Sequence, residues 1–158
     1  MTARRTPPWT WLLATAVIAY GLDRGTKLWA ESALAGRPPV VVIPRVLALN
    51  FTTNSGGAFG LAQSAWWIFA FATIGVSIGI VVAAPRVRTL ATAIGLGLIL
   101  GGALGNLTDR LFRGDILLRG YVIDFIDVHI WPVFNLADSS IVVGALLLAL
   151  FAARHEDA

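Results

Sequence analysis

Two aspartates stand in stretches of sequence that are otherwise apolar. Asp124 lies between Ile123 and Phe125 in "VIDFID", and Asp138 lies in "VFNLADSSIVVGALLLALF", near the start of a long apolar run. An ionised carboxylate in membrane surroundings is costly, so such an acid is a functional-site hypothesis that requires a partner. Two neighbouring carboxyl groups do not readily both ionise, and one keeps its proton while the other acts as a base. Such a pair can activate water and protonate a leaving amine, which is the chemistry of aspartic peptidases.

Other polar residues lie at the ends of apolar segments, several at helical spacing. Asp23 and Lys27 are four residues apart and share one face of a helix, as do Asn106 and Arg110 in "GNLTDR". We expect this second group to lie at nearly the same membrane depth as the two acids. Its members are Asp23, Lys27, Asn54, Gly56, Asn106, Asp109, Arg110 and Asn135.

Each of these residues also has a purely structural interpretation. Asp23 with Lys27 can be a simple ion pair, "NSGG" from Asn54 can be only a turn, and the "DR" of "GNLTDR" can be a helix cap with an interfacial anchor. Asp138 can be the N-cap of the apolar helix that follows it. The apolar "VF" before "NLAD" favours instead a position for Asp138 inside the helix.

The composition is that of an integral membrane protein with a single domain, residues 1–158. Hydrophobic residues make up 57% of the chain and charged residues 13%, where soluble proteins carry about a quarter. The chain has no cysteine, which excludes disulfides and thiolate catalysis. Its histidines, His129 and His155, are far apart, so we expect neither a metal nor another cofactor. The net charge is +3, but the arginines are scattered at the ends of apolar runs, and nucleic acid is not an expected partner.

Four segments are apolar and long enough to span a membrane, at residues 9–30, 65–84, 89–107 and 132–153. Positive charge in short flanks predicts cytoplasmic termini, from Arg4, Arg5, Arg86, Arg88 and Arg154. Three arginines lie on the opposite side, at Arg110, Arg113 and Arg119. The basic start of the first segment also allows a secretory signal peptide, but no small-x-small site precedes a hydrophilic domain, which favours a retained helix.

The outer segments, residues 31–64 and 108–131, contain strand patterns. Val40 to Ile43 is a β-branched run, and Tyr121 to Ile126 is a second candidate strand. We therefore predict a mainly α-helical membrane protein with four transmembrane helices and a small extracytoplasmic sheet.

The chain resembles the lipoprotein signal peptidase family, signal peptidase II. The resemblance is carried by five stretches in the same order, and it covers essentially the whole chain. These stretches are "DRGTK", "NSGGAFG", "GALGNLTDR", "VIDFID" and "FNLADSS".

The resemblance implies a monomeric aspartic endopeptidase of the bacterial inner membrane, with a β-cradle and an active site near the extracytoplasmic face. Its expected partners are membrane lipid and prolipoproteins, which it would cut just before the diacylglyceryl-modified cysteine. Asp124 and Asp138 match the catalytic pair. The positions that line and orient the site match Asn54, Asn106, Arg110 and Asn135, and those that support it match Asp23, Lys27 and Asp109.

Two departures from the family pattern limit this hypothesis, and two other functions compete with it. Gly57 stands where the family commonly has alanine, and the stretch "LFRGDILLRGY" before "VIDF" is longer than the family pattern leads us to expect. A small membrane carrier is an alternative function, although spans two and three have no acid at their centres. A structural adaptor is another, and it would not require Asp124 or Asp138 at all.

Overall fold

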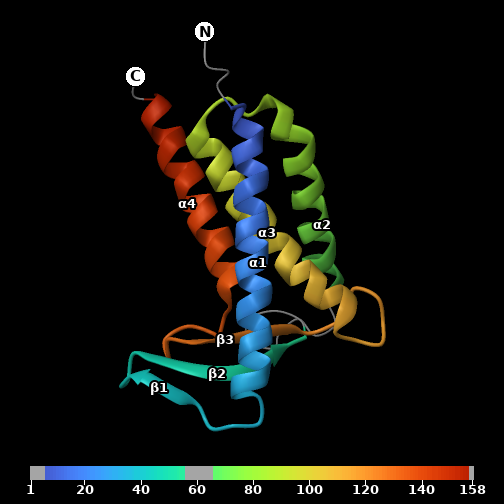
Figure 1. Cartoon of the computed structure of the whole chain (residues 1–158), viewed down its shortest axis with the longest axis vertical. Coiled ribbons are helices and arrows are strands. Elements are labelled where there is room, and N and C mark those ends of the chain that lie inside the picture. The colour runs from blue at the N-terminus through green and yellow to red at the C-terminus, as the bar shows by residue number, and fades with distance from the viewer. Residues whose placement is uncertain (1–5, 56–65, 157–158) are drawn as a thin grey trace.

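The computed structural model describes residues 6–55 and 66–156. A bundle of helices stands on a small sheet, and both ends of the chain lie at the far end of the bundle from the sheet (Figure 1). The helices are α1 (Pro8–Leu34), α2 (Trp66–Ala83), the 3-10 turn η2 (Ala84–Arg86), α3 (Leu90–Phe112) and α4 (Leu136–Glu156). The strands are β1 (Val40–Ile43), β2 (Leu47–Asn54) and β3 (Val122–Asp127).

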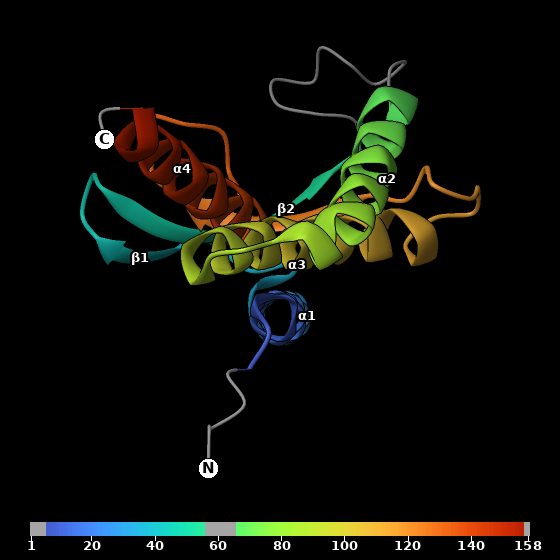
Figure 2. The same cartoon turned by 90° about the horizontal axis from the view of Figure 1, so that it is seen from above.

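Helix α3 is the central element of the bundle. It packs against α1, α2 and α4, while α2 and α4 diverge from each other on the side of α3 away from α1 (Figure 2). Glycines allow this close packing, because a Cβ at Gly101 would collide with the carbonyl oxygen of Ala16 in α1. A Cβ at Gly102 would collide in the same way with Ala137 in α4. Small residues at helix contacts are the usual means of close packing in membranes.

Three helices among the described residues are long and apolar enough to cross a membrane. These segments are Trp67–Arg86, Leu90–Phe112 and Leu136–Ala153. They correspond to the second, third and fourth predicted spans, although α3 continues to residue 112 and α4 begins only at residue 136. Helix α1 falls outside this set because Asp23, Arg24 and Lys27 interrupt its apolar sequence, so its crossing of the membrane stays a prediction.

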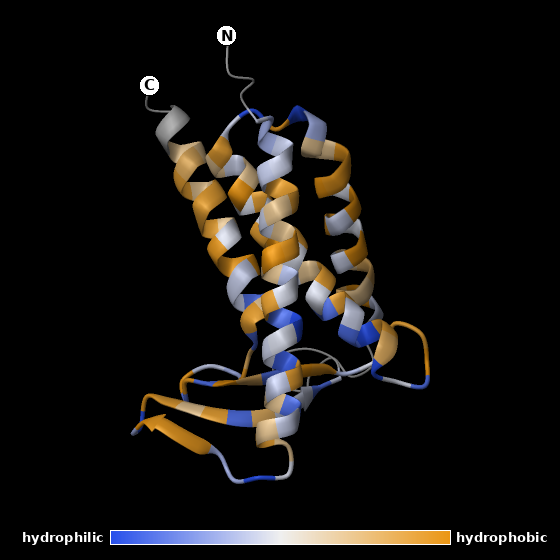
Figure 3. Ribbon diagram, in the orientation of Figure 1, coloured by the Kyte–Doolittle hydropathy of each residue, from blue (hydrophilic) through white to orange (hydrophobic). Residues whose placement is uncertain are grey.

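The outer sides of the helices carry apolar side chains, and the hydrophilic residues gather where the bundle meets the sheet (Figure 3). On α1, for example, Val17 and Ile18 are largely exposed. An apolar outer surface suits lipid and not water, in agreement with the composition.

The predicted strands are present and form one antiparallel sheet in the order β1-β2-β3. The sheet is held to the bundle through β3, whose buried Ile123 and Phe125 pack against Ala30 and Leu34 at the end of α1. Phe134 extends the sheet by bridging Ile126, which explains why α4 starts later than the apolar pattern suggests. This docking fixes the height of β3 relative to the helices.

Candidate active site

Asp124 lies in the middle of β3 and is 2% exposed. Its two carboxylate oxygens accept hydrogen bonds from the side-chain amides of Asn54 (3.1 Å) and Asn135 (2.6 Å). Asn54 is within reach because β2 pairs with β3 and places Thr52 opposite Asp124. Burial raises the pKa of Asp124 to about 7, with a further contribution from the charge of Asp138. The hydrogen bonds from the two asparagines act in the opposite direction.

Asp138 is the third residue of α4, so it lies inside the helix as the sequence predicts. Asn135 precedes the helix, and its Oδ1 accepts a hydrogen bond from the backbone N–H of Asp138 (2.9 Å). In return, the backbone N–H of Asn135 donates to the Asp138 carboxylate (3.2 Å). This reciprocal arrangement is a capping box, and it makes Asn135 the N-cap.

Asn135 therefore connects the two acids. The side-chain nitrogen of Asn135 donates a hydrogen bond to the Asp124 carboxylate, and its side-chain Oδ1 accepts one from the backbone N–H of Asp138. Both carboxyl groups line one cavity of about 320 Å³, together with Asn54, Asn106 and Arg110. The predicted convergence of these residues is thus present in the structure.

Asn106 joins this pair to a buried cation. Its Oδ1 accepts hydrogen bonds from the ammonium group of Lys27 (2.8 Å) and from the amide of Asn135 (3.2 Å). Because an ammonium group can only donate, the amide nitrogen of Asn106 faces the other way. It donates to Oδ1 of Asp138 at 2.8 Å.

Lys27 is fully buried and pairs with two carboxylates, Asp23 at 3.0 Å and Asp109 at 2.9 Å. The predicted Asp23–Lys27 pair is therefore one part of a larger cluster. Asp23 also accepts a hydrogen bond from the backbone N–H of Ala137 (3.1 Å), which ties α1 to the first turn of α4.

Two arginines complete the cluster around Asp109, and the sequence reasoning did not single them out for the site. Arg24 contacts the Asp109 carboxylate, and Arg113 binds it at 2.8 Å while also pairing with Glu31. Arg113 lies four residues after Asp109, a spacing that could have identified it. Arg24 gives no such signal, because the two partners are 85 residues apart.

Arg110 is 7% exposed and lies over the ring of Phe69, 6.0 Å from its centroid. Its Nη1 has no hydrogen-bond partner among residues 6–55 and 66–156. A buried guanidinium nitrogen without a partner at the wall of a cavity is suited to bind an oxygen of a bound molecule.

Two further predictions concern Gly56 and metals. Gly56 lies outside the described residues, as does Gly57. Within the described part of the chain, no group of three or more His, Asp or Glu side chains is arranged to hold a metal ion.

Comparisons of the sequence with a family model and with known proteins agree on one family. A family model described as "Signal peptidase (SPase) II" matches residues 15–154. The lipoprotein signal peptidase of Rhodococcus jostii (strain RHA1) is 42% identical over 139 residues, which cover 88% of this chain and 70% of that protein. The protein of the same name from Mycobacterium tuberculosis (strain ATCC 25618 / H37Rv) is 44% identical over 139 residues, or 88% and 69% of the two chains.

Solved structures of bacterial membrane enzymes share the fold. One has a TM-score of 0.76 and 28% identity, with 90% of this chain and 87% of that chain covered. A second has a TM-score of 0.76 and 29% identity, with coverage of 89% and 91%.

Proposed function

Because this chain belongs to the signal peptidase II family, we propose that it is an aspartic endopeptidase that removes signal peptides from prolipoproteins. The scissile bond is the one just before the diacylglyceryl-modified cysteine, and Asp124 with Asp138 form the catalytic pair. The observation that carries the proposal is the sharing of Asn135 by two carboxyl groups that line one cavity.

The two acids have different roles at neutral pH. Burial raises the pKa of Asp124, so we assign the proton of the pair to Asp124 and the role of base to Asp138. A water molecule between them loses a proton to Asp138 and attacks the scissile carbonyl carbon, while Asp124 donates its proton to the carbonyl oxygen. The carbon–nitrogen bond then breaks as Asp138 passes its proton to the leaving amine. Asp124 regains a proton from the hydroxyl group of the intermediate.

The neighbouring polar residues hold the acids and receive the substrate. Asn54, Asn106 and Asn135 each donate to one carboxylate, which supports a positioning role for all three. Arg110 has an unpaired Nη1 at the cavity wall, which supports a contact with a backbone carbonyl of the signal peptide.

Lipid recognition is supported by a second cavity beside Asp138. Its volume is about 460 Å³ and its lining is almost entirely apolar, including Trp131, Phe134 and Val142. An apolar space next to the catalytic acid suits the acyl chains that accompany the modified cysteine.

The membrane topology follows from the same proposal. Helix α1 is the first of four spans, both termini are cytoplasmic, and the sheet and the acids are at the extracytoplasmic face of the bacterial cytoplasmic membrane. The connection between α2 and α3, which contains Arg86, lies at the end of the bundle away from the sheet, as do the start of α1 and the end of α4, in accordance with the positive-inside rule (Figure 1). The charges in the inner part of α1 are tolerated because Lys27 pairs with Asp23 and Arg24 pairs with Asp109 of α3. The enzyme acts as a monomer.

The decisive experiment compares the purified protein with Asp124→Asn and Asp138→Asn on a diacylglyceryl-modified prolipoprotein in detergent. Asp115→Asn, in an exposed loop, is the matched control. Release of the signal peptide is read as a gel shift, and folding is checked by thermal unfolding. We expect cleavage by the wild type and the control and none by the other two folded variants. Cleavage by folded Asp138→Asn, or none by the wild type, would refute the proposal and favour a carrier or an adaptor.

A further inference from the structure

The loop between α3 and β3, residues 113–121, is fixed at its base. The backbone N–H of Gly120 donates to the carbonyl oxygen of Arg110 (2.9 Å), so the chain returns against the helix it has just left. Gly120 permits this return, because a Cβ there would collide with the carbonyl oxygens of Asp109 and Arg110. Arg113 holds the other side through Asp109 and Glu31. The base of the loop therefore has a conformation that is fixed by contacts with α3 and α1.

The tip of this loop is apolar. Ile116 is 54% exposed and Leu117 is 70% exposed, and the preceding Phe112 is 80% exposed. Leu118 has a φ of 66°, a left-handed conformation that is unfavourable for a non-glycine residue. Loops that face water are normally polar, and a tight turn in water favours glycine or asparagine. The exposed apolar side chains at the tip are therefore unsuited to contact with water, and we expect them to contact an apolar environment.

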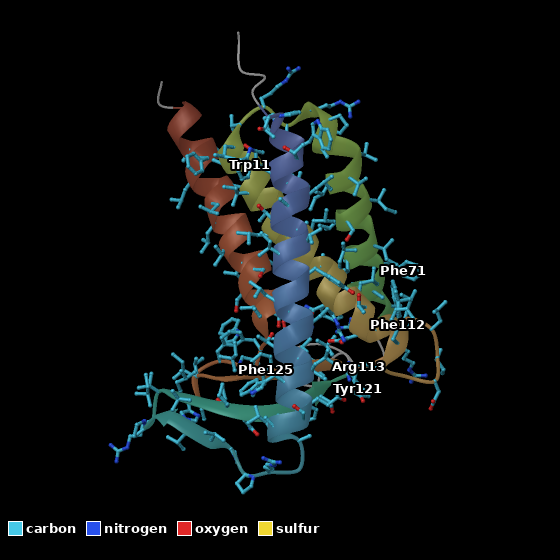
Figure 4. All side chains as sticks on the ribbon, in the orientation of Figure 1. Trp11, Phe71, Phe112, Arg113, Tyr121 and Phe125 are labelled. Carbon is cyan, nitrogen blue, oxygen red and sulfur yellow. The ribbon has the colours of Figure 1, made fainter. Side chains whose placement is uncertain are left out.

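The position of the loop identifies this medium as lipid. The loop projects sideways where α2 begins and α3 ends, away from the β1–β2 side of the sheet (Figure 1). Phe112 is the last residue of a span, and it lies on the same flank of the molecule as the exposed Phe71 of α2 (Figure 4). The apolar tip thus continues the lipid-facing surface of two spans.

The charges of the loop agree with this environment. Arg119 is exposed directly after the apolar tip, and Asp115 is exposed directly before it. Segments that lie in the membrane interface combine bulky apolar residues with cations that reach the lipid phosphates.

We propose that the α3–β3 loop is a membrane anchor, with Ile116, Leu117 and Phe112 inserted in the leaflet on the side of the sheet. Arg119 lies at the level of the phosphates. The base of the loop is bound to the end of α3, and the carboxylate of Asp109 also accepts a hydrogen bond from the backbone N–H of Ile123 (3.4 Å). Ile123 directly precedes Asp124, so the anchor fixes the depth of this acid in the bilayer.

The first test measures depth and is independent of any catalytic activity. The chain has no cysteine, so single-cysteine variants can carry an environment-sensitive bimane label without background. Leu117→Cys is compared with Asp115→Cys in proteoliposomes that contain brominated phospholipid, and iodide serves as the aqueous quencher. We expect at least twofold stronger quenching by the brominated lipid at position 117, and stronger quenching by iodide at position 115. Equal quenching at both positions, or stronger iodide quenching at 117, would overturn the proposal.

The second test uses the activity and therefore also depends on the proposed function. Ile116→Ser with Leu117→Ser is compared with the apolar control Ile116→Leu with Leu117→Ile. We expect the serine variant to lose cleavage several-fold in proteoliposomes and to retain it in detergent, while the control retains it in both. Equal loss in both media would contradict the anchor and indicate a protein contact. Absence of cleavage by the wild type would refute the proposed function and leave the quenching result unaffected.

Discussion

The ammonium nitrogen of Lys27 lies 2.8 Å from the Oδ1 of Asn106, and the amide nitrogen of Asn106 lies 2.8 Å from the Asp138 carboxylate. A buried cation on α1 thus determines which end of an asparagine on α3 faces an acid on α4. The orientation of this amide is fixed by chemistry, because the ammonium group cannot accept a hydrogen bond.

Removal of the Lys27 charge should affect stability and activity in separable ways. Lys27→Met leaves Asp23 buried without its cation, which we expect to destabilise the fold by about 3–5 kcal/mol. The double variant Lys27→Met with Asp23→Asn removes both charges, so stability should largely return. Activity should stay low in the double variant, because Asn106 still lacks the group that orients it. Thermal unfolding and initial cleavage rates measure the two effects, and full recovery of the rate would refute the orienting role.

Arg110 should contribute to substrate turnover more than to folding. Its Nη1 has no partner within the described residues, so Arg110→Gln removes no hydrogen bond of that nitrogen in the structure. We expect kcat/KM to fall about 100-fold, which corresponds to about 2.7 kcal/mol. Arg37→Gln, at an exposed position outside the site and the α3–β3 loop, is the control and should keep the wild-type kcat/KM. A large fall in Tm for Arg110→Gln with an unchanged kcat/KM would contradict this role.

The raised pKa of Asp124 predicts a specific dependence of stability on pH. The folded protein holds a proton on Asp124 up to about pH 7, whereas the unfolded chain releases it near the ordinary value of 3.8. The folded state thus binds more protons between these values, and this group's contribution to the unfolding free energy falls as pH rises through that window. Asp124→Asn removes the effect.

The Tm difference between Asp124→Asn and the wild type, taken as variant minus wild type, should be more positive at pH 8 than at pH 5. Both proteins are measured in the same detergent. Asp115→Asn, at an exposed position, should show no such difference between the two pH values. An Asp124→Asn variant with the same relative Tm at both pH values would show that Asp124 ionises normally.

Substitution by alanine of a glycine through which α3 contacts another helix should lower the stability of the fold. A Cβ at Gly101 meets the Ala16 carbonyl oxygen, so Gly101→Ala must separate α1 from α3, at a cost of about 1–3 kcal/mol. Gly79 in α2 has no atom within 4 Å of the added Cβ, and Gly79→Ala is the matched control. Thermal unfolding should show a lower Tm for the first variant alone. An equal Tm for both would mean that α1 and α3 have room to separate.

The sequence predicted the elements of the site better than the contacts between them. Apolar length identified three spans, β-branched runs identified strands, and the apolar setting of Asp124 and Asp138 singled out two acids that line one cavity. These features depend on a residue and its near neighbours. The Lys27–Asn106 contact joins residues 79 positions apart, and only the packing of α1 against α3 creates it. The later start of α4 likewise depends on the bridge between Phe134 and Ile126.

The contact between Asp23 and the backbone N–H of Ala137 has a consequence for biosynthesis. Asp23 of α1 caps the turn that carries Asp138, so α1 and α4 must meet before the site exists. A nascent chain that stops short of α4 has Lys27, Asn54 and Asn106 but lacks Asn135 and one carboxyl group. On the proposed mechanism, the protein is thus unable to cut a neighbour in the membrane until α4 has been synthesised and has packed against α1.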